Sequence, residues 1–333
     1  MLQPRSTRCP TPRHKDWEEL LASAVAIIGS GFIGRGWAIA YARCGYEVRM
    51  WDPREDALAT AKDYIASILP DLANADLLNG HDAAEISRRI ASMPTLEEAL
   101  DGVCHVQENA PEILDLKIAL FTNLDRHTPP DAVIASSTSS LLPSAFTEAL
   151  KGRARCVVAH PVNPPHLIRL VEIVPASWTS EETVRRTVDL MQSLGQQPVL
   201  VKREIDGFLL NRLQAAVLDE CFRLVDGGYA SAADVDACIR DGLASRWIFM
   251  GPFETIDLNA PGGVRDYVER YQAMFRRMTD TMRKSADWTG AVLETIEAER
   301  RGALPFTDLN NRHIWRDRNL IEVAKFRRDM LDE

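Results

Sequence analysis

The stretch from Val25 to Asp52 constrains the fold most strongly, because it places a glycine-rich turn between two short apolar runs. Residues Val25 to Ile28 are apolar and mostly β-branched, which is typical of a strand buried on both faces. They are followed by Gly29-Ser-Gly-Phe-Ile-Gly34, by a helix-forming segment, and by a second strand-like run that ends before Asp52. The order strand, glycine turn, helix, strand and acid is typical of a dinucleotide-binding unit.

Each glycine of this turn has a physical reason to be glycine. Gly29 permits a tight turn, Gly31 lets the backbone approach a pyrophosphate, and Gly34 lets the helix lie close to its strand. The pyrophosphate is then expected to face the N–H groups and the positive dipole end of the helix. The predicted cofactor contacts are Gly29, Ser30, Gly31, Phe32, Ile33 and Gly34.

Asp52 indicates which dinucleotide is bound. A carboxylate at the end of the second strand accepts hydrogen bonds from both ribose hydroxyls and repels a 2′-phosphate, which favours NAD over NADP. Arg54 lies two residues further on and softens this preference. The alternative is a glycine turn in another kind of α/β protein, but it leaves the flanking strands and the acid unexplained. We therefore predict that the cofactor is NAD.

The pattern of elements changes once along the 333 residues. Strand-like and helical runs alternate up to residue 205, which predicts an α/β Rossmann domain with a doubly wound, mostly parallel sheet. From Asp206 onward we find only helical patterns. The sequence therefore predicts a flexible tail over residues 1–22, a Rossmann domain over 23–205 and an all-α domain over 206–333.

The individual elements are predicted as follows. Further strands are expected at residues 103–107, 132–135, 155–159, 170–174 and 198–201. Residues 55–89 are expected to be helical, with a break at Pro70 and a turn at Asn79-Gly80. The other predicted helices span 112–124, 143–150, 181–194, 207–225, 233–241, 264–284, 288–300 and 316–331.

Charge and composition exclude several classes of protein. A net charge of −9 argues against a nucleic-acid binder, because an acidic surplus repels phosphate backbones. No apolar run approaches the ~18 residues that a membrane span needs. The six cysteines show no metal-type spacing and most lie in apolar runs, so we expect buried, reduced thiols in a cytoplasmic protein.

His160 is the histidine whose surroundings predict chemistry. It ends the strand that begins at Cys156 and precedes the proline-rich turn Pro161-Val-Asn-Pro-Pro165, at the edge where doubly wound sheets bind ligands. The alternative is a structural histidine at a strand end. Five other histidines lie in polar surroundings and are expected to be solvated, namely His14, His81, His105, His127 and His313.

Three polar residues are candidates to act with this histidine. Glu172 lies inside an apolar run, where a carboxylate is costly unless it is paired. A pair with His160 would fix the tautomer of the imidazole and favour the imidazolium, whereas the alternative is an edge-strand acid facing water. Ser139 follows a strand and Asn211 opens a helix, so each is either a substrate ligand or an ordinary turn or cap residue.

Six motifs together resemble the 3-hydroxyacyl-CoA dehydrogenase superfamily, and within it the branch of λ-crystallin and L-gulonate 3-dehydrogenase. The motifs are GSGFIG, ENAPEILDLK, SSTSSL, HPVNPP with LVEIV, DGFLLNRL and RWIFMGPFETIDLN. The likeness covers about residues 23–325. It implies a general base at His160 that Glu172 orients, a substrate hydroxyl or carbonyl contacted by Ser139 and Asn211, and a homodimer. The further NAD contacts that it implies are Glu112, Lys117, Ser139 and Asn163.

The sequence departs from the acyl-CoA members of this family in two places. Those members have an aromatic pair after the catalytic histidine, where this chain has Pro161-Val162. They also carry lysines after the second strand, whereas residues 55–87 contain seven acids and one basic residue, Lys62. Such a surface repels the phosphates of CoA and favours a small free acid. Arg246 is the candidate ligand for its carboxylate, the alternative being a surface arginine stacked on Trp247.

Three functions follow from this resemblance. The first is NAD-dependent oxidation of the 3-hydroxyl of a small polar acid such as L-gulonate. The second is a 3-hydroxyacyl-CoA or carnitine dehydrogenase with the same machinery, in which aromatic residues would surround the carnitine ammonium group. The third is a non-catalytic, crystallin-like NAD-binding protein. The intact set of His160, Glu172, Ser139 and Asn211 favours an enzyme.

Overall fold

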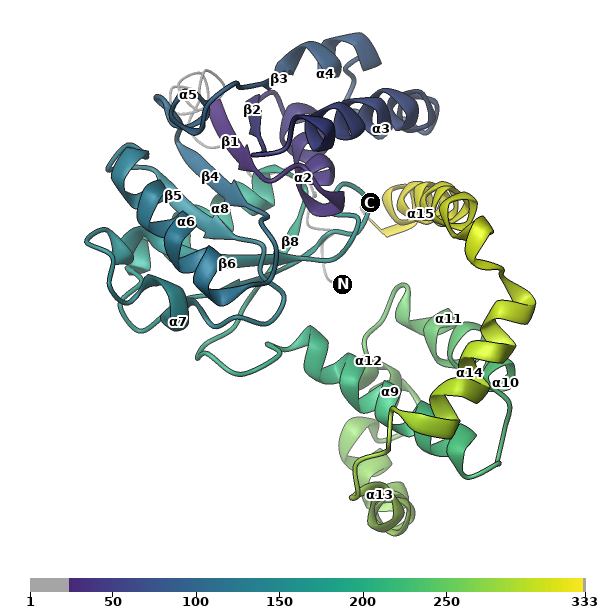
Figure 1. Ribbon diagram of the computed structural model, residues 1–333. Helices are drawn as coiled ribbons and strands as arrows, with labels where there is room; N and C mark the ends of the chain where they lie inside the picture. The colour runs from purple at the N-terminus through teal and green to yellow at the C-terminus, as the bar shows by residue number, and fades with distance from the viewer. Residues whose placement is uncertain (1–23, 332–333) are drawn as a thin grey trace, which may run out of the picture. The chain divides into compact units, whose positions relative to one another are not determined.

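Strand β1 (Ala24–Ile28) lies inside an eight-stranded sheet in a computed structural model that describes residues 24–331 (Figure 1). The strand order is β3-β2-β1-β4-β5-β6-β7-β8, and every neighbouring pair is parallel except β6 with β7. The other strands are β2 (Glu47–Trp51), β3 (Ile90–Ser92), β4 (His105–Glu108), β5 (Val133–Ser136), β6 (Cys156–Pro161), β7 (Leu170–Val174) and β8 (Gln197–Leu200). The predicted Rossmann fold is confirmed.

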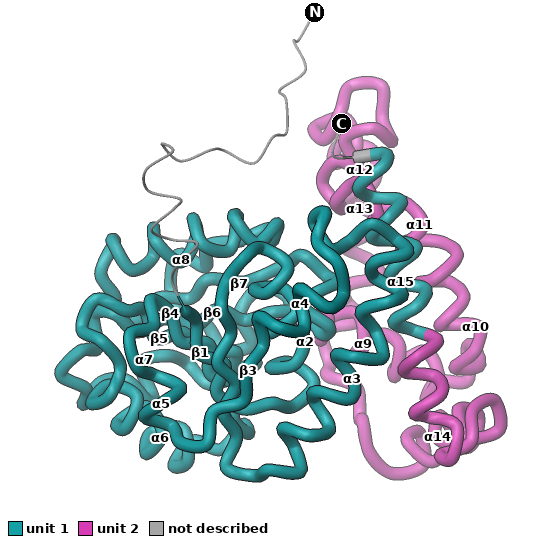
Figure 2. Tube along the Cα trace, turned by 90° about the horizontal axis from the view of Figure 1, so that it is seen from above, with its two compact units in different colours: residues 1–211, 316–333 teal, residues 212–315 magenta. Residues whose placement is uncertain are grey.

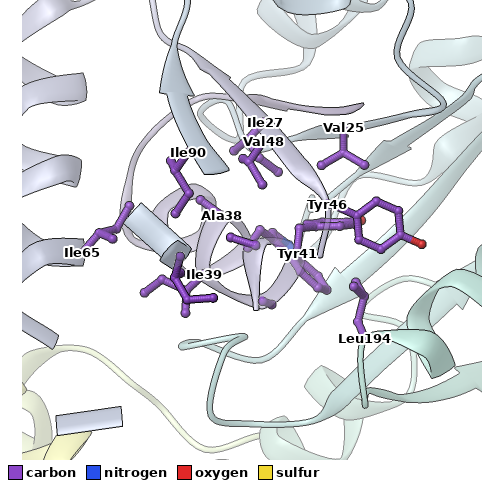
Figure 3. Close-up of a cluster of buried hydrophobic side chains, with 14 of the residues drawn as sticks. Val25, Ile27, Ala38, Ile39, Tyr41, Tyr46, Val48, Ile65, Ile90 and Leu194 are labelled. Carbon is purple, nitrogen blue, oxygen red and sulfur yellow. The ribbon is translucent and has the colours of Figure 1, made fainter. Parts of the chain in front are cut away.

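The side chains of β1 alternate between two apolar cores, as the period of a strand requires. Val25 and Ile27 join a core on one face of the sheet, and the neighbouring residues of β1 join a core on the other face. Figure 3 shows part of the first core, where Tyr41 and Tyr46 pack edge to face with their ring centroids 5.8 Å apart. Burial of both faces fixes the sheet whose edge carries the candidate site.

Helices cover both faces of this sheet (Figure 1). The helices that pack on the first core include α2 (Phe32–Ala42), α3 (Glu55–Asn74), α4 (Ala83–Arg89) and α8 (Glu181–Ser193). Those on the second core are α5 (Leu96–Leu100), α6 (Leu114–His127) and α7 (Pro143–Thr147). The structure is therefore a layer of helices, a sheet and a second layer of helices.

The break predicted at Pro70 is wrong, because α3 runs through this residue without ending. A proline inside a helix costs about 3 kcal/mol. Ile65, Leu69 and Leu72 bury their side chains on the same helix, and each buried aliphatic side chain contributes about 1.5–3 kcal/mol. Burial therefore outweighs the cost of the proline.

Short elements escaped prediction from the sequence. Strand β3 has three residues and α5 has five, and α12 (Pro252–Leu258) was also not expected. Such lengths are too short for a periodic pattern to emerge from the apolar residues. They form because of contacts with neighbouring elements, such as the backbone pairing of β3 with β2.

The chain divides into two compact units (Figure 2). Unit 1 contains residues up to Asn211 together with the segment that begins at Arg316, and unit 2 contains Arg212–Trp315. These limits differ from the predicted domain limits because the last part of α15 (Leu309–Leu331) packs on unit 1. There Ile321 enters the first core and Asp317 accepts a hydrogen bond from Tyr64 at 3.0 Å. The predicted tail over residues 1–22 lies outside the described residues.

Unit 2 is helical, as predicted. A π-helix over Cys238–Leu243 lies between α10 and α11. The α-helices are α9 (Leu210–Asp226), which starts in unit 1, α10 (Ala232–Ala237), α11 (Ala244–Trp247), α12, α13 (Gly263–Met282), α14 (Gly290–Ala303) and the start of α15. Within residues 24–331, no helix has the length and apolar character to cross a membrane.

The predicted exposure of several residues needs correction. Among the described cysteines Cys156 alone is buried, whereas Cys238 is exposed and Cys44, Cys104 and Cys221 are half-buried. His105 was expected to be solvated but is buried, because it lies in the central strand β4 and bonds Gln107 through Nε2 at 3.1 Å. Burial lowers the pKa of His105 to about 4.

His166 is a second buried histidine. Neither of its ring nitrogens has a hydrogen-bond partner among residues 24–331, and burial, followed by the charges of nearby arginines, lowers its pKa to about 3. The folded protein therefore keeps both His105 and His166 neutral at pH values where the unfolded chain binds protons. Because the unfolded chain binds these protons below pH ~6.5 and the folded protein does not, the free energy of unfolding is highest above pH ~6.5. It decreases as the pH falls from there toward 4.

We predict that acid destabilises the protein mainly through these two histidines. The free energy of unfolding in urea should fall by roughly 1–2 kcal/mol per histidine between pH 7 and pH 5. The variant His166→Leu should show about half of this fall, and His127→Gln on the surface of α6 should show all of it. An unchanged pH dependence in His166→Leu would contradict the assignment.

Candidate active site

The glycine turn joins β1 to α2 with the close packing expected of a dinucleotide site. Gly29 has φ +90°, and a Cβ on Gly34 would lie 1.9 Å from the carbonyl oxygen of Gly29. At Gly31, in contrast, no described atom lies within 4 Å of the position that a Cβ would take. The turn is therefore packed on its inner side at Gly34 and open above Gly31.

The start of α2 is suited to an anion. Its N-cap is Gly31, no side chain among the described residues caps it, and its first turn carries no acid. Backbone N–H groups at such an end attract a pyrophosphate. Ser30 is buried, whereas Phe32 is exposed and lies against the Arg35 guanidinium, 4.5 Å from the ring centroid.

Asp52 lies beside this turn, directly after β2. Its Oδ2 atom accepts hydrogen bonds from the N–H of Ser30 at 2.8 Å and from the Ser30 hydroxyl at 3.0 Å. Its Oδ1 atom accepts from the N–H of Arg54, whose own guanidinium pairs with Asp56 at 3.3 Å. The carboxylate is thus held at the rim of the turn, where a ribose is expected, and the residues of this turn fit NAD.

His160 and Glu172 face each other across the antiparallel pair β6 and β7. The Nδ1 atom of His160 lies 2.8 Å from Oε2 of Glu172, and both side chains are buried. Burial alone would raise the pKa of Glu172, but hydrogen bonds from His160 and from two backbone N–H groups lower it overall. The acid therefore stays ionised and holds Nδ1, which leaves Nε2 for a substrate.

Ser139 and Asn211 also come together. The Nδ2 atom of Asn211 donates to the carbonyl oxygen of Ser139 at 2.7 Å. The other oxygen of Glu172, Oε1, accepts from the N–H groups of Leu209 and Leu210, which directly precede Asn211. Hydrogen bonds, together with the backbone from Leu209 to Asn211, therefore link His160 to the loop of Ser139.

Glu112 holds this loop from the side of α6. Its carboxylate accepts hydrogen bonds from the N–H groups of Ser140 at 3.0 Å and Leu141 at 3.1 Å, and from the hydroxyls of Thr138 and Ser140. Burial would raise the pKa of Glu112, but these bonds and the charge of Lys117 lower it overall. The structure thus gives Glu112 a structural contact beside the NAD contact that the resemblance implies.

Lys117, which the resemblance implies as a cofactor contact, lies in a buried ion pair in this structure. Its ammonium group is fully buried and lies 2.8 Å and 2.9 Å from the two oxygens of Glu108. Ser136 donates to the same carboxylate at 2.6 Å. The buried ion pair therefore joins α6 to the end of β4, and the bond from Ser136 ties the end of β5 to the same carboxylate.

A polar network behind the glycine turn was not predicted. The hydroxyl of Ser137 accepts from Gln107 at 2.8 Å and donates to Asn109 at 2.8 Å. Asn109 in turn donates to the carbonyl oxygen of Ile28, and Gln107 donates to that of Ala159. The network thus joins the residue before Gly29 to the residue before His160. The polar side chains of the strand predicted over residues 103–107, His105 and Gln107, were the available signal.

The remaining predicted site residues are exposed. Asn163 lies in the turn after β6, on the N-terminal side of a cis peptide bond to Pro164. Arg246 lies on α11 of unit 2, directly after the π-helix, and its guanidinium makes no ion pair or hydrogen bond with the described residues. Exposed aromatic side chains flank it in the sequence, namely Trp247, Phe249 and Phe253.

The Rossmann sheet, the glycine turn and the strand-end histidine with its acid define the class of dinucleotide-dependent dehydrogenases. Comparison with protein families identifies the chain more closely. Residues 24–205 match the NAD binding domain of 3-hydroxyacyl-CoA dehydrogenase, and residues 207–308 match its C-terminal domain. The chain belongs to the 3-hydroxyacyl-CoA dehydrogenase family, whose members are NAD-dependent oxidoreductases, and its cofactor is NAD.

Two relatives illustrate the range of this family. The chain is 41% identical to lambda-crystallin from Oryctolagus cuniculus over 312 residues, which are 93% of this chain and 98% of that protein. It is 38% identical to L-carnitine dehydrogenase from Burkholderia mallei over 247 residues, 74% of this chain and 76% of that protein. The recognised branch of the family is confirmed.

Solved structures resemble the chain as well. The structure of 5-formyl-3-hydroxy-2-methylpyridine 4-carboxylic acid 5-dehydrogenase, described as an NAD⁺-dependent dismutase, has a TM-score of 0.80 at 25% identity and covers 92% of this chain and 98% of that one. The 3-hydroxybutyryl-CoA dehydrogenase of Escherichia coli has a TM-score of 0.62 at 31% identity, over 71% of this chain and 49% of that one.

We predict that the two inner glycines of the turn respond differently to alanine. A methyl group on Gly31 meets open space and a φ of −63°, so Gly31→Ala should keep the melting temperature while it weakens NAD binding at least tenfold, about 1.4 kcal/mol. Gly34→Ala should lower both the melting temperature and the affinity for NAD, because its Cβ collides with the carbonyl oxygen of Gly29. Isothermal titration and thermal melts measure the two effects. An unchanged affinity in Gly31→Ala would exclude a close approach of NAD at this residue.

Proposed function

We propose that the protein is an NAD-dependent dehydrogenase that oxidises the 3-hydroxyl of a small polar 3-hydroxy acid, as an L-gulonate 3-dehydrogenase does. The observation that carries this proposal is the buried pair of His160 and Glu172 at the carboxyl end of β6, 2.8 Å apart. Doubly wound sheets bind their ligands at this edge. A base that takes a proton from a hydroxyl is what alcohol oxidation requires there.

In the proposed mechanism, Nε2 of His160 takes the proton of the substrate hydroxyl as the C3 carbon becomes a carbonyl. NAD, when bound, supplies the acceptor for the hydride that leaves C3. The ionised Glu172 holds Nδ1–H and stabilises the imidazolium that forms. A positioned base of this kind contributes roughly 10²–10⁴ in rate.

Ser139 and Asn211 are the proposed ligands of the reacting oxygen. Hydrogen bonds to that oxygen hold the hydroxyl toward His160 in the alcohol and polarise the carbonyl in the reverse direction. The bond between Asn211 and the carbonyl of Ser139 supports this assignment, because it holds the Asn211 side chain against the backbone of Ser139. Glu112 and Asn163 are proposed to line the NAD site beside them.

The charges after β2 favour a free acid over a CoA ester. Seven acids and one lysine occupy residues 55–87, the segment of α3 and the start of α4. A polyphosphate nucleotide would be repelled from such a surface. The relationship to L-carnitine dehydrogenase keeps a trimethylammonium acid as the second candidate, because exposed aromatic residues in unit 2 suit a quaternary ammonium group.

A non-catalytic role remains the alternative of another class, since lambda-crystallin is a relative. The buried acid argues against it. A carboxylate inside the apolar strand β7 is costly, and a buried acid paired with a histidine at the ligand edge is typical of a catalytic site. We therefore propose an enzyme, which acts in the cytoplasm.

We predict that purified protein forms NADH with L-gulonate faster than with 3-hydroxybutyrate, L-carnitine or 3-hydroxybutyryl-CoA. The variant His160→Gln should lose activity by about 10²-fold or more and still bind NAD, because the base is removed and the glycine turn is untouched. Absorbance of NADH measures the activity, and titration with NAD measures the binding. Equal activity in His160→Gln would reject this base.

Arg246 is the proposed ligand of the substrate carboxylate. It carries a charge on an exposed helix beside aromatic residues, and its guanidinium has no ion-pair or hydrogen-bond partner among the described residues. A guanidinium binds a carboxylate through two parallel hydrogen bonds. The assignment therefore needs no rearrangement of an existing ion pair.

We predict that Arg246→Met raises the KM for the acid by roughly 10- to 100-fold, the value of a charged hydrogen bond. The matched variant Arg277→Met removes an exposed arginine of the same unit on α13 and should leave KM unchanged. Steady-state kinetics with the best substrate of the panel compares them. If both variants behave like the wild type, Arg246 is not in the site.

A homodimer through unit 2 is also proposed. One face of α13 carries apolar residues that repeat every three or four positions, the spacing of a helix that packs on another helix. All are 38–43% exposed in the single chain: Val264, Val268, Tyr271, Phe275, Met278 and Met282. A second copy of the chain is the occupant that such a stripe suits.

We predict that the protein sediments as a dimer and that Phe275→Glu shifts it toward the monomer, because a charge enters the apolar contact. Arg277→Glu, two residues away on the opposite side of α13, is the matched control and should sediment like the wild type. A monomeric wild type in sedimentation velocity would contradict the proposal.

A further inference from the structure

The connector Asp206–Asn211 leads from the sheet into α9 and has an unusual backbone. Gly207 has φ +73° and Phe208 has φ +49°. The left-handed region suits glycine, but a bulky residue such as phenylalanine is rarely found there, because its Cβ approaches the backbone. The conformation at Phe208 therefore persists because surrounding contacts hold it.

Burial is the first of these contacts. The ring of Phe208 is fully buried in the second core, in a cluster that includes Val158 of β6 and Val174 of β7. Its centroid lies 5.6 Å from that of the His160 imidazole. The strained residue of the connector is thus a direct neighbour of the candidate base.

Glu172 supplies the second contact. Its Oε1 atom accepts hydrogen bonds from the N–H groups of Leu209 at 2.7 Å and Leu210 at 3.0 Å. These donors lie at the start of α9, where a helix leaves N–H groups without partners and where a negative charge is favourable. The carboxylate thus acts as the N-terminal cap of the helix that leads into unit 2.

The two oxygens of Glu172 therefore serve different partners. Oε2 faces Nδ1 of His160, and Oε1 faces the connector. The next residue, Asn211, is bonded to the carbonyl of Ser139. Three consecutive residues of the connector are in this way tied to the elements that carry the candidate base and the candidate substrate ligand.

We infer that Glu172 is a positioning residue for the connector as well as for the imidazole. The same carboxylate sets the ring orientation of His160 and the point at which α9 begins. The start of α9 therefore stays ordered only while the side chain of residue 172 places an acceptor oxygen beside the N–H groups of Leu209 and Leu210. This inference goes beyond the proposed function, because the capping bonds need neither a substrate nor a reaction.

Two variants of Glu172 separate its tasks. Glu172→Gln keeps an oxygen for the connector but presents an N–H₂ group to His160, so that Nδ1 must accept and the proton moves to Nε2. The base is then in the wrong tautomer. Glu172→Ala removes both contacts. His160→Gln removes the imidazole and leaves the capping bonds of Glu172 intact.

Hydrogen exchange of the full chain, read by mass spectrometry over residues 206–212, tests the inference. We expect slow exchange in the wild type, in His160→Gln and in Glu172→Gln. In Glu172→Ala we expect exchange at Leu209 and Leu210 to be at least about tenfold faster, because two charged hydrogen bonds are lost. Peptides from β1 and α2 serve as the internal control and should not change in any variant.

Activity gives the independent readout. Both Glu172 variants should lose activity, whereas Glu172→Ala alone should release the connector. Wild-type exchange in Glu172→Ala, or equally fast exchange in Glu172→Gln, would overturn the inference. Should Glu172→Ala not fold, Glu172→Asp keeps the charge but is one methylene shorter, and it should release the connector in the same way. If the proposed function is wrong but the inference is right, the wild type will be inactive on the substrates tested while its residues 206–212 still exchange slowly.

Discussion

The site depends on one buried carboxylate whose oxygens are both occupied. Glu172 lies inside an apolar strand, where an unpaired charge would cost several kcal/mol. Its contacts with His160 and with the start of α9 remove that cost and keep the pKa of the acid below its ordinary value. The same contacts fix the imidazole and the chain that enters the helical unit. One buried charge thus holds three segments together, namely β6, β7 and the start of α9.

Buried polar contacts also fix the ends of the central strands. The buried pair of Lys117 and Glu108 joins α6 to β4, and Ser136 ties β5 to the same carboxylate. The Ser137 network joins the glycine turn to the residue before His160. Breaking a buried pair is strongly destabilising, because it leaves an uncompensated charge. These contacts keep the NAD turn and the candidate base in register, as the proposed transfer of a hydride from C3 and of a proton from its hydroxyl group requires.

The sequence predicted what local patterns encode. The glycine turn, Asp52 and the change to helices all follow from spacing and periodicity, and the structure contains them. The pairing of His160 with Glu172 was inferred from the cost of a buried acid, although the antiparallel register of β6 and β7 was not. Long-range contacts escaped prediction. The return of α15 to unit 1 joins Tyr64 to Asp317, 253 positions away, and no local pattern records such a contact. The burial that keeps α3 helical through Pro70 was also not predicted, because it depends on contacts with distant parts of the chain.

A crystal structure of the protein with NAD and an unreactive hydroxy-acid analogue tests the central claim most directly. The account predicts that the nicotinamide ring lies at the carboxyl end of β6, with Nε2 of His160 within hydrogen-bond distance, about 3 Å, of the analogue's 3-oxygen. Glu172 should still hold Nδ1. A nicotinamide ring bound away from β6, or a His160 that has turned its Nε2 toward Glu172, would contradict it.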